Sequence, residues 1–258
     1  MLTSRSNAPR SVTKCPPNLC RWAVSLLSSA MTLNAQGIQW DLVRDFPDLA
    51  AAPTATNPNG AWSYGWKESA SVGALPIGTF HPFHLVNTPG IVDWQGGALW
   101  AGGQAWKNCS SVTLVGIPPG QVSVNADFGS TSTIRFTAPV TGDYVMSGGF
   151  GWGDGGKGIR SVFRNETELW RTTGAGSFDF TTSNPLALVA GDTLDFTIWG
   201  HTAWYAGWGN TPVFATLNLV SPVPEPETYG VMAALGLAGF GIYRARRRPC
   251  AAGKPLAA

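Results

Sequence analysis

The sequence predicts an all-β protein, an antiparallel β-sandwich or jelly roll, with a processed segment at each end. Short runs rich in Val, Ile, Thr, Phe and Trp recur with turn signals about every 8–12 residues, as in sandwiches and jelly rolls. Helical periodicity is hard to find between residues 36 and 222. We therefore expect one β-sandwich domain over 36–222, flanked by an N-terminal signal peptide and a single short C-terminal transmembrane helix.

Each expected strand is a short run bounded by turn residues. Alternation is clearest where Ile134 and Phe136 share one face. Residues 165–167 predict a hairpin turn, and residues 190–192 predict another turn. Residues 36–110 are less regular, and we expect them to add edge strands or to wrap the sandwich. The expected strands are 111–117, 121–124, 133–137, 143–147, 159–164, 168–171, 177–182, 186–189, 193–199 and 213–220.

The first 35 residues predict a signal peptide. Four basic residues without acidic companions precede an apolar run over 22–33, and Ala35 is the candidate last residue before cleavage. Cys15 and Cys20 lie in this removable segment, so we do not expect them to form a zinc or redox pair. The basic residues are Arg5, Arg10, Lys14 and Arg21.

The C-terminal segment combines a proline-rich motif, an apolar run and a basic cluster. Val223, Pro224, Glu225 and Pro226 should be extended, because proline fixes φ and lacks an amide proton. The uncharged run 229–243 predicts a transmembrane helix, although its 15 residues are fewer than the roughly 20 of a stable span. We expect it to anchor the chain only transiently, with 249–258 as a cytoplasmic tail. The stop-transfer cluster is Arg244, Arg246, Arg247 and Arg248.

Residues 223–248 resemble the PEP-CTERM sorting signal of exported proteins in Gram-negative bacteria. The resemblance rests on Val-Pro-Glu-Pro, a short hydrophobic helix and an arginine cluster, and it covers 26 of the 258 residues. It implies processing near the Pro-Glu-Pro by an exosortase-type membrane transpeptidase. It also implies transient anchoring in the inner membrane, followed by a place at the cell surface or in the extracellular matrix.

The domain between the two ends is acidic. Residues 36–222 contain 8 Lys and Arg against 13 Asp and Glu, a net charge of −5, whereas the whole chain carries +2. An acidic domain is a poor candidate for binding nucleic acid or anionic lipid, so we expect no nucleic-acid partner. Cys109 is the one cysteine of this segment, so no intramolecular disulfide can form there.

The body of the chain also resembles known proteins. Residues 59–65, 134–144 and 188–196 resemble the bodies of many PEP-CTERM surface proteins of unassigned function. The pattern is similar, too, to the β-sandwich carbohydrate-binding modules of secreted glycosidases. This resemblance implies a fold and a cell-surface setting, and it assigns no catalytic residue to this chain.

Aromatic residues supply the candidate ligand site. Eleven of the twelve tryptophans fall within 36–222, and the segment 199–210 is especially rich in aromatic rings. Trp and Tyr faces suit stacking on sugar rings, while Asp154, His201 or Asn210 could bond sugar hydroxyls. The alternative is that these rings only cover the open end of the sandwich. The candidate ligand-binding residues are Trp152, Asp154, Trp204, Tyr205 and Trp208.

Other patterns indicate chemistry only weakly. Residues 151–158 nearly form a phosphate loop but lack its Ser or Thr. His81, His84, Asp93 and His201 could be drawn as a zinc site, and Cys109 as a nucleophile, without support from their spacing. Asp179 with Glu168 is one arbitrary pair of carboxylates for glycoside hydrolysis. We therefore expect no enzyme and no cofactor, with a structural Ca²⁺ held by Asp143 and Asp154 left open.

These observations favour a non-catalytic, exported cell-surface or extracellular-matrix protein that is processed through its sorting signal. Exopolysaccharide is its candidate ligand. Two alternatives stay open: a secreted hydrolase acting on polysaccharide or ester, and a self-associating adhesion module.

Overall fold

Two antiparallel sheets make up most of the described chain. The computed structural model describes residues 37–68, 78–96, 103–125, 130–154, 158–174, 176–199, 209–222 and 226–246. The chain divides into two units, 1–36 and 37–258, and every described residue belongs to the second. The predicted signal peptide 1–35 and the predicted tail 249–258 therefore lie outside the described residues.

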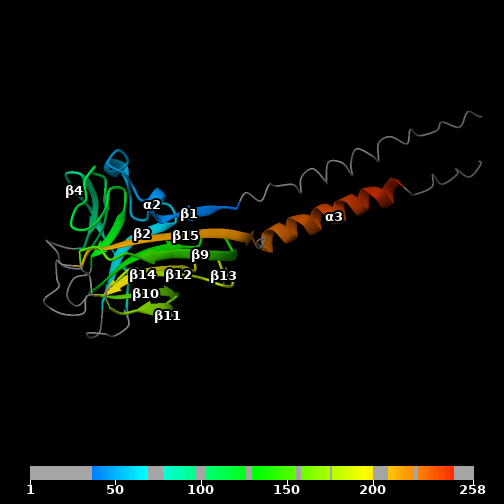
Figure 1. Cartoon of the computed structure of the whole chain (residues 1–258). Coiled ribbons are helices and arrows are strands. Elements are labelled where there is room, and N and C mark those ends of the chain that lie inside the picture. Colours follow the sequence, from blue (N-terminus) through cyan, green and yellow to red (C-terminus); the bar gives the residue numbers. More distant parts are fainter. Residues whose placement is uncertain are drawn as a thin grey trace, which may run out of the picture. The chain divides into compact units, whose positions relative to one another are not determined.

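The strands are short, and they follow one another with little helix between them (Figure 1). They are β1 (Gln39–Asp41), β2 (Trp62–Glu68), β3 (His81–Pro82), β4 (His84–Thr88), β5 (Ile91–Gln95), β6 (Gln104–Asn108), β7 (Val122–Asn125), β8 (Ser130–Thr137), β9 (Gly142–Phe150), β10 (Ile159–Arg164), β11 (Thr167–Thr172), β12 (Phe178–Thr181), β13 (Leu186–Leu188), β14 (Thr193–Trp199) and β15 (Thr211–Pro222). The helical elements are α2 (Leu42–Asp45), the 3₁₀ turn η1 (Ala52–Thr54) and α3 (Pro226–Arg246).

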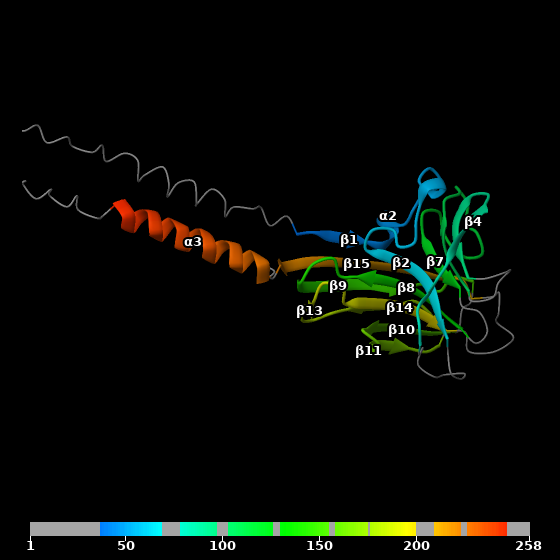
Figure 2. The ribbon, with the colours of Figure 1, turned by 180° about the vertical axis from the view of Figure 1, so that it is seen from behind.

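In the described residues the larger sheet has nine strands, in the order β12-β9-β15-β7-β6-β5-β4, with β1 paired to β15 and β13 to β9. The smaller sheet has six, in the order β11-β10-β14-β8-β2-β3. Figure 2 shows β8, β14, β10 and β11 following one another on one side, with β9 and β15 beside them. The all-β, antiparallel prediction is confirmed.

The core lies between the inward faces of the two sheets. Ile134 and Phe136, which the sequence places on one face, are both fully buried. Phe136 packs against Trp40 and Tyr144 of the opposite sheet, with ring centroids 5.4 and 6.0 Å apart. The period-2 pattern of β8 thus selects the buried face, as expected for a strand with one face toward a core.

The predicted hairpin at 165–167 forms as a two-residue turn. Asn165 and Glu166 have φ values of 44° and 72°, the left-handed backbone that a tight β10–β11 connection requires. The Asn165 side chain holds the turn: its Oδ1 accepts from the Thr193 amide at 2.8 Å, and its Nδ2 donates to Asp192 at 2.8 Å. The two predicted turns, 165–167 and 190–192, therefore support each other.

The prediction of a strand over 111–117 is wrong. Val112 and Val115 are exposed, and Leu114 pairs with Ile117 only in an isolated bridge. Buried Asn108 explains the difference, because its amide donates to the carbonyls of Val112 and Ile117 at 2.8 Å each and folds the segment into a loop.

Residues 36–110 contribute more than edge strands and wrapping loops. Strand β2 lies inside the smaller sheet, between β8 and β3.

The C-terminal segment differs from its prediction in two ways. Pro226, expected to be extended, is the first residue of α3, a position where its missing amide proton costs nothing. The predicted transmembrane helix 229–243 is not supported: among the described residues, no helix is both long enough and apolar enough to cross a bilayer. The apolar run of α3 is short and is diluted by four glycines, Gly230, Gly236, Gly239 and Gly241. Arg244 and Arg246 end the helix, whereas Val223, Pro224, Glu225, Arg247 and Arg248 lie outside the described residues.

Candidate functional site

Strand ends of both sheets meet at one end of the sandwich and carry polar side chains there. β7 ends at Asn125 and β8 begins at Ser130, and the Ser132 hydroxyl donates to the Asn125 carbonyl at 2.6 Å. β15 begins beside the end of β7, with Thr211 opposite Val124. We call this region the polar end. Its described polar residues are Gln104, Asn125, Ser130, Thr131, Asp154 and Asn210.

Two segments that the sequence singled out come together at the polar end. The segment 151–154 follows β9, and residues 209–210 lead into β15. The Gly151 amide donates to the Pro212 carbonyl at 2.8 Å, and Asn210 Nδ2 donates to Asp154 Oδ2 at 3.0 Å. Asn210 is buried, and its Oδ1 accepts from the Trp106 indole at 2.9 Å. Asp154 is therefore held by an amide that is itself fixed in the core.

Glycine makes this approach possible. A Cβ atom on Gly153 would lie 1.6 Å from the Asn210 carbonyl oxygen, and the φ of this residue is +61°. A side chain at this position would push 151–154 away from 209–210. The glycines of the segment thus serve close packing between two chain segments, which explains their pattern better than a phosphate loop does.

Several buried oxygens at the polar end have no hydrogen-bond partner among the described residues. They are Asn125 Oδ1, Ser130 Oγ, Thr131 Oγ1 and Asp154 Oδ1. A buried polar atom left unpaired costs about 1–3 kcal/mol, so such atoms are few in native proteins and need an explanation. At this end of the sandwich the described residues therefore leave four buried acceptor atoms unpaired. No signal in the sequence identifies Asn125, Ser130 and Thr131, because only strand pairing brings them together.

Trp152 is the exposed tryptophan among those that the structure describes, with 41% of its surface accessible. Trp62, Trp94, Trp106 and Trp199 are buried. Most of the other described tryptophans are partly buried and pack against the core, namely Trp40, Trp66 and Trp170. Trp152 stands two residues before Asp154, and its ring is available for contact with a ligand. Trp204, Tyr205 and Trp208, the other predicted ligand residues, lie outside the described residues, as does His201.

The metal sites that the sequence indicated only weakly do not assemble among the described residues. Among the described residues, no group of three or more His, Cys, Asp and Glu could hold a metal ion. The His81 ring stacks on Trp66 at 4.3 Å, and His84 is exposed. Asp143 begins β9 and Asp154 follows its end, which separates them by more than about 20 Å along the strand. Asp143 and Asp154 therefore cannot bind the same Ca²⁺ ion.

The two carboxylates that served as an arbitrary example of a hydrolytic pair lie in different sheets. Asp179 lies on β12 of the larger sheet and Glu168 on β11 of the smaller one, where it accepts from Arg171 at 2.8 Å. The pair therefore has no shared position across a glycosidic bond.

Asp93 is the described carboxyl with the most unusual environment. It is buried on β5, one oxygen accepts from Gln95 Nε2 at 2.5 Å, and the other has no partner among the described residues. Burial raises the pKa of Asp93 to about 6, against the opposing effects of Gln95 and the nearby His84. A lone carboxyl of this kind does not make a catalytic pair.

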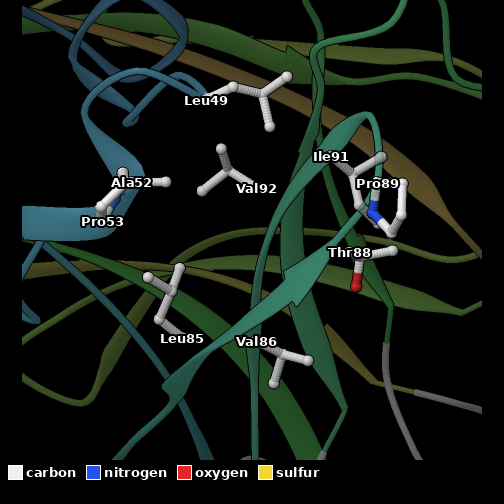
Figure 3. Close-up of a pocket in the computed structure, with 9 residues that line it drawn as sticks. All are labelled: Leu49, Ala52, Pro53, Leu85, Val86, Thr88, Pro89, Ile91 and Val92. Carbon is white, nitrogen blue, oxygen red and sulfur yellow. The ribbon is translucent and has the colours of Figure 1, made fainter.

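An apolar pocket of about 300 Å³ lies between η1 and the β4–β5 hairpin (Figure 3). Leu49, Ala52, Leu85, Ile91 and Val92 line it, together with Thr88. Figure 3 shows Leu49, Ala52 and Leu85 around Val92, with Thr88 at the margin. Apart from Thr88, nothing in this pocket can orient a polar ligand, so the polar end is the stronger candidate site.

Comparison with known proteins identifies the C-terminal segment. The family model described as "PEP-CTERM protein-sorting motif" matches residues 222–248. No curated protein matches the chain.

Three solved structures are similar to parts of the chain. GITRL from bushbaby has 14% identity and a TM-score of 0.26, covering 35% of this chain and 71% of that one. A family 35 carbohydrate-binding module from Clostridium thermocellum has 9% identity and a TM-score of 0.24, with 50% and 87% covered. The isomalto-dextranase of Arthrobacter globiformis T6, complexed with panose, has 15% identity and a TM-score of 0.26, with 70% and 32% covered. With TM-scores this low, these similarities say nothing about the function of this chain.

Proposed function

We propose that this chain, which carries a PEP-CTERM protein-sorting motif at residues 222–248, is an exported protein of the cell surface or extracellular matrix that binds polysaccharide. The motif supports export and processing by an exosortase-type membrane transpeptidase. Val223, Pro224, Glu225 and Pro226 are the proposed processing residues. The β-sandwich is then the part that functions outside the cell.

The observation that carries the binding function is the exposed Trp152 ring, two residues before the Asp154 carboxylate that Asn210 holds. A sugar ring has an apolar C–H face that packs on an indole ring, and hydroxyls around its edge that bond carboxylates and amides. Asp154 is oriented by Asn210, so little ordering is needed when a ligand binds. Trp204, Tyr205 and Trp208 are proposed to complete this surface.

Neither alternative function has a comparable observation in its favour. The carboxylates suggested for hydrolysis lie in different sheets, and Asp93 stands apart from both. Self-association would need a surface complementary to itself. We therefore keep non-catalytic polysaccharide binding as the function that the geometry supports best.

The experiment is retention of the full chain on exopolysaccharide from the producing cells. Trp152→Ala should weaken binding by about tenfold, the effect of removing one stacking ring worth about 1.4 kcal/mol. Leu169→Ala is the matched control, because Leu169 is equally exposed, at 40%, on β11 of the other sheet. Retention of Trp152→Ala equal to that of Leu169→Ala would contradict the proposal, and release of reducing sugars by the wild type would favour the hydrolase instead.

A further inference from the structure

A second surface lies on the outward face of the larger sheet, away from the core. Phe214 on β15 pairs with Gly149 on β9, and Gly149 pairs in turn with Asp179 on β12. The Phe214 ring is 46% exposed. A Cβ atom on Gly149 would lie 2.7 Å from both Phe214 Cζ and Asp179 Oδ1, so the ring and the carboxylate both reach over the glycine.

The next rows of the same face carry polar side chains from β15, β9 and β12. Thr216, Ser147 and Thr181 lie opposite one another on β15, β9 and β12, and Asn218 lies opposite Val145 in the row beyond. Figures 1 and 2 show β15 and β9 running side by side along this sheet. We call this surface the outer platform. It consists of Phe214, Gly149, Asp179, Thr216, Ser147, Thr181 and Asn218.

Strand alternation determines which residues form the platform. On β15, Val213, Ala215 and Leu217 are buried in the core, so Phe214, Thr216 and Asn218 face outward. The side chains of Ser147, Thr216 and Asn218 form no hydrogen bond with another described residue. The platform therefore offers donors and acceptors that the fold itself does not use.

The charges of the platform restrict its ligand. Its rows contain Asp179 but no Lys or Arg, and β1 continues the Thr216 row with Asp41. Arg44 donates to the Gln39 carbonyl beside Asn218, but its guanidinium is paired with Asp45 at 2.8 Å. An anionic polysaccharide would therefore meet like charge here and a cation that is already paired. A neutral polysaccharide needs only an apolar surface for its C–H face and polar groups for its hydroxyls, and the platform supplies both.

We propose that the outer platform binds a neutral polysaccharide chain, with Phe214 stacked on one sugar ring and the Ser147, Thr216 and Asn218 rows bonding the hydroxyls of the next. Gly149 forms the floor of the stacking position, and Asp179 bonds the hydroxyls at the edge of the same ring. The row beyond Phe214 pairs Pro212 with Gly151, and Trp152 follows Gly151 directly. This site goes beyond the proposed function, because its residues lie along the sheet face and not at the polar end.

The test is affinity electrophoresis of the full chain in gels that contain dextran, hydroxyethylcellulose or laminarin, with alginate as the anionic comparison. The wild type should be retarded by at least one of the three neutral glucans and not by alginate. Phe214→Ala should raise the dissociation constant about tenfold or more, whereas Phe214→Trp should keep or strengthen binding. Val220→Ala is the matched control, since Val220 is also exposed on β15, at 54%, but lies outside the platform rows.

The outcomes separate this site from the polar end. Loss of binding in Phe214→Ala with binding kept in Trp152→Ala supports the platform and counts against the polar end. The reverse result overturns the platform and leaves the proposed function standing. Lack of retardation by every neutral glucan overturns the platform, and so does a Phe214→Ala variant that binds like Val220→Ala.

Light scattering tests whether the face instead binds a second copy of the chain. If wild-type copies associate and Phe214→Ala abolishes the association, the face is a self-contact surface. Thermal unfolding of Phe214→Ala checks its fold, and Asp179→Ala provides a second variant with the same expected direction.

Discussion

Replacing Asp195 should destabilise the sandwich far more than removing an exposed charge does. Asp195 lies on β14, and its carboxylate binds two cations. Arg135 donates to it through Nε at 2.7 Å and through a terminal nitrogen at 2.8 Å, and Lys67 Nζ lies 3.0 Å from Oδ2. Lys67 and Asp195 are both only 2% exposed. Asp195→Ala would therefore leave a buried ammonium group facing a neutral methyl group.

The cost follows from desolvation of the charge that remains. Removing one partner of a buried ion pair typically costs about 3–5 kcal/mol, because the other charge stays in a poorly solvated place. Partial relief can come from Glu166, whose carboxylate lies 3.8 Å from Lys67 Nζ but is largely exposed. The exposed pair Glu168–Arg171 has a similar distance, 2.8 Å, at about 30% exposure, and such pairs contribute about 0–1 kcal/mol. Glu168→Ala is therefore the matched control.

Urea unfolding followed by tryptophan fluorescence measures both variants. With a slope of about 2–3 kcal/mol per M, Asp195→Ala should lower the midpoint by about 1–2 M, and Glu168→Ala by less than about 0.5 M. Asp195→Asn, which keeps the shape and one acceptor, should fall between them. If Asp195→Ala and Glu168→Ala lose the same free energy of unfolding within about 0.5 kcal/mol, burial of this ion pair does not matter and the reasoning is refuted.

Two further predictions concern pH and backbone packing. The pKa of Asp93 is about 6 in the folded protein, above its unfolded value of about 3.9, so the folded state keeps its proton longer. The stability that this retained proton contributes is complete below about pH 4 and is lost as pH rises to about 6. The Asp93→Asn variant has no such proton to lose, so the urea midpoints of wild type and variant should diverge between about pH 4 and 6 when they are measured every half pH unit. Parallel curves would contradict the raised pKa of Asp93. At the polar end, Gly153→Ala should cost more than about 2 kcal/mol, because its Cβ would collide with the Asn210 backbone, whereas Gly120→Ala has open space around it at a similar positive φ. Equal midpoints for these two alanine variants would show that 151–154 does not pack on 209–210.

Local patterns predicted much of the fold. The strands over 121–124, 133–137, 159–164, 168–171 and 193–199 agree closely with the structure, since each is an alternating or β-branched run next to a recognisable turn. The run 111–117 shows the limit of this reasoning. Its β-branched residues suit a strand, but buried Asn108 bonds the carbonyls on both sides of the loop, and the strand forms earlier, at 104–108. A tertiary hydrogen bond overrode the local preference there.

The candidate site residues show the same contrast between what local sequence predicts and what only tertiary contacts decide. Trp152 and Asp154 could be named from composition because a tryptophan in a glycine-rich loop is conspicuous. The pairing of Asp154 with Asn210 could not be predicted, because 56 residues separate them in the chain. Phe214 was counted only as part of a strand, since nothing local shows that its cross-strand neighbour is a glycine.

The sequence by itself determined the sorting signal, the antiparallel β class and the acidic character of the body, because each depends on residues close together in the chain or on composition alone. Only the tertiary structure decided which tryptophans are buried, which strand ends share the polar end, and that Asp143 and Asp154 stand at opposite ends of β9. The physical reason is that strand order and register are set by the packing of two whole sheets against each other. A shift of one residue would turn each core side chain outward, so the faces are defined only when all the strands are in place.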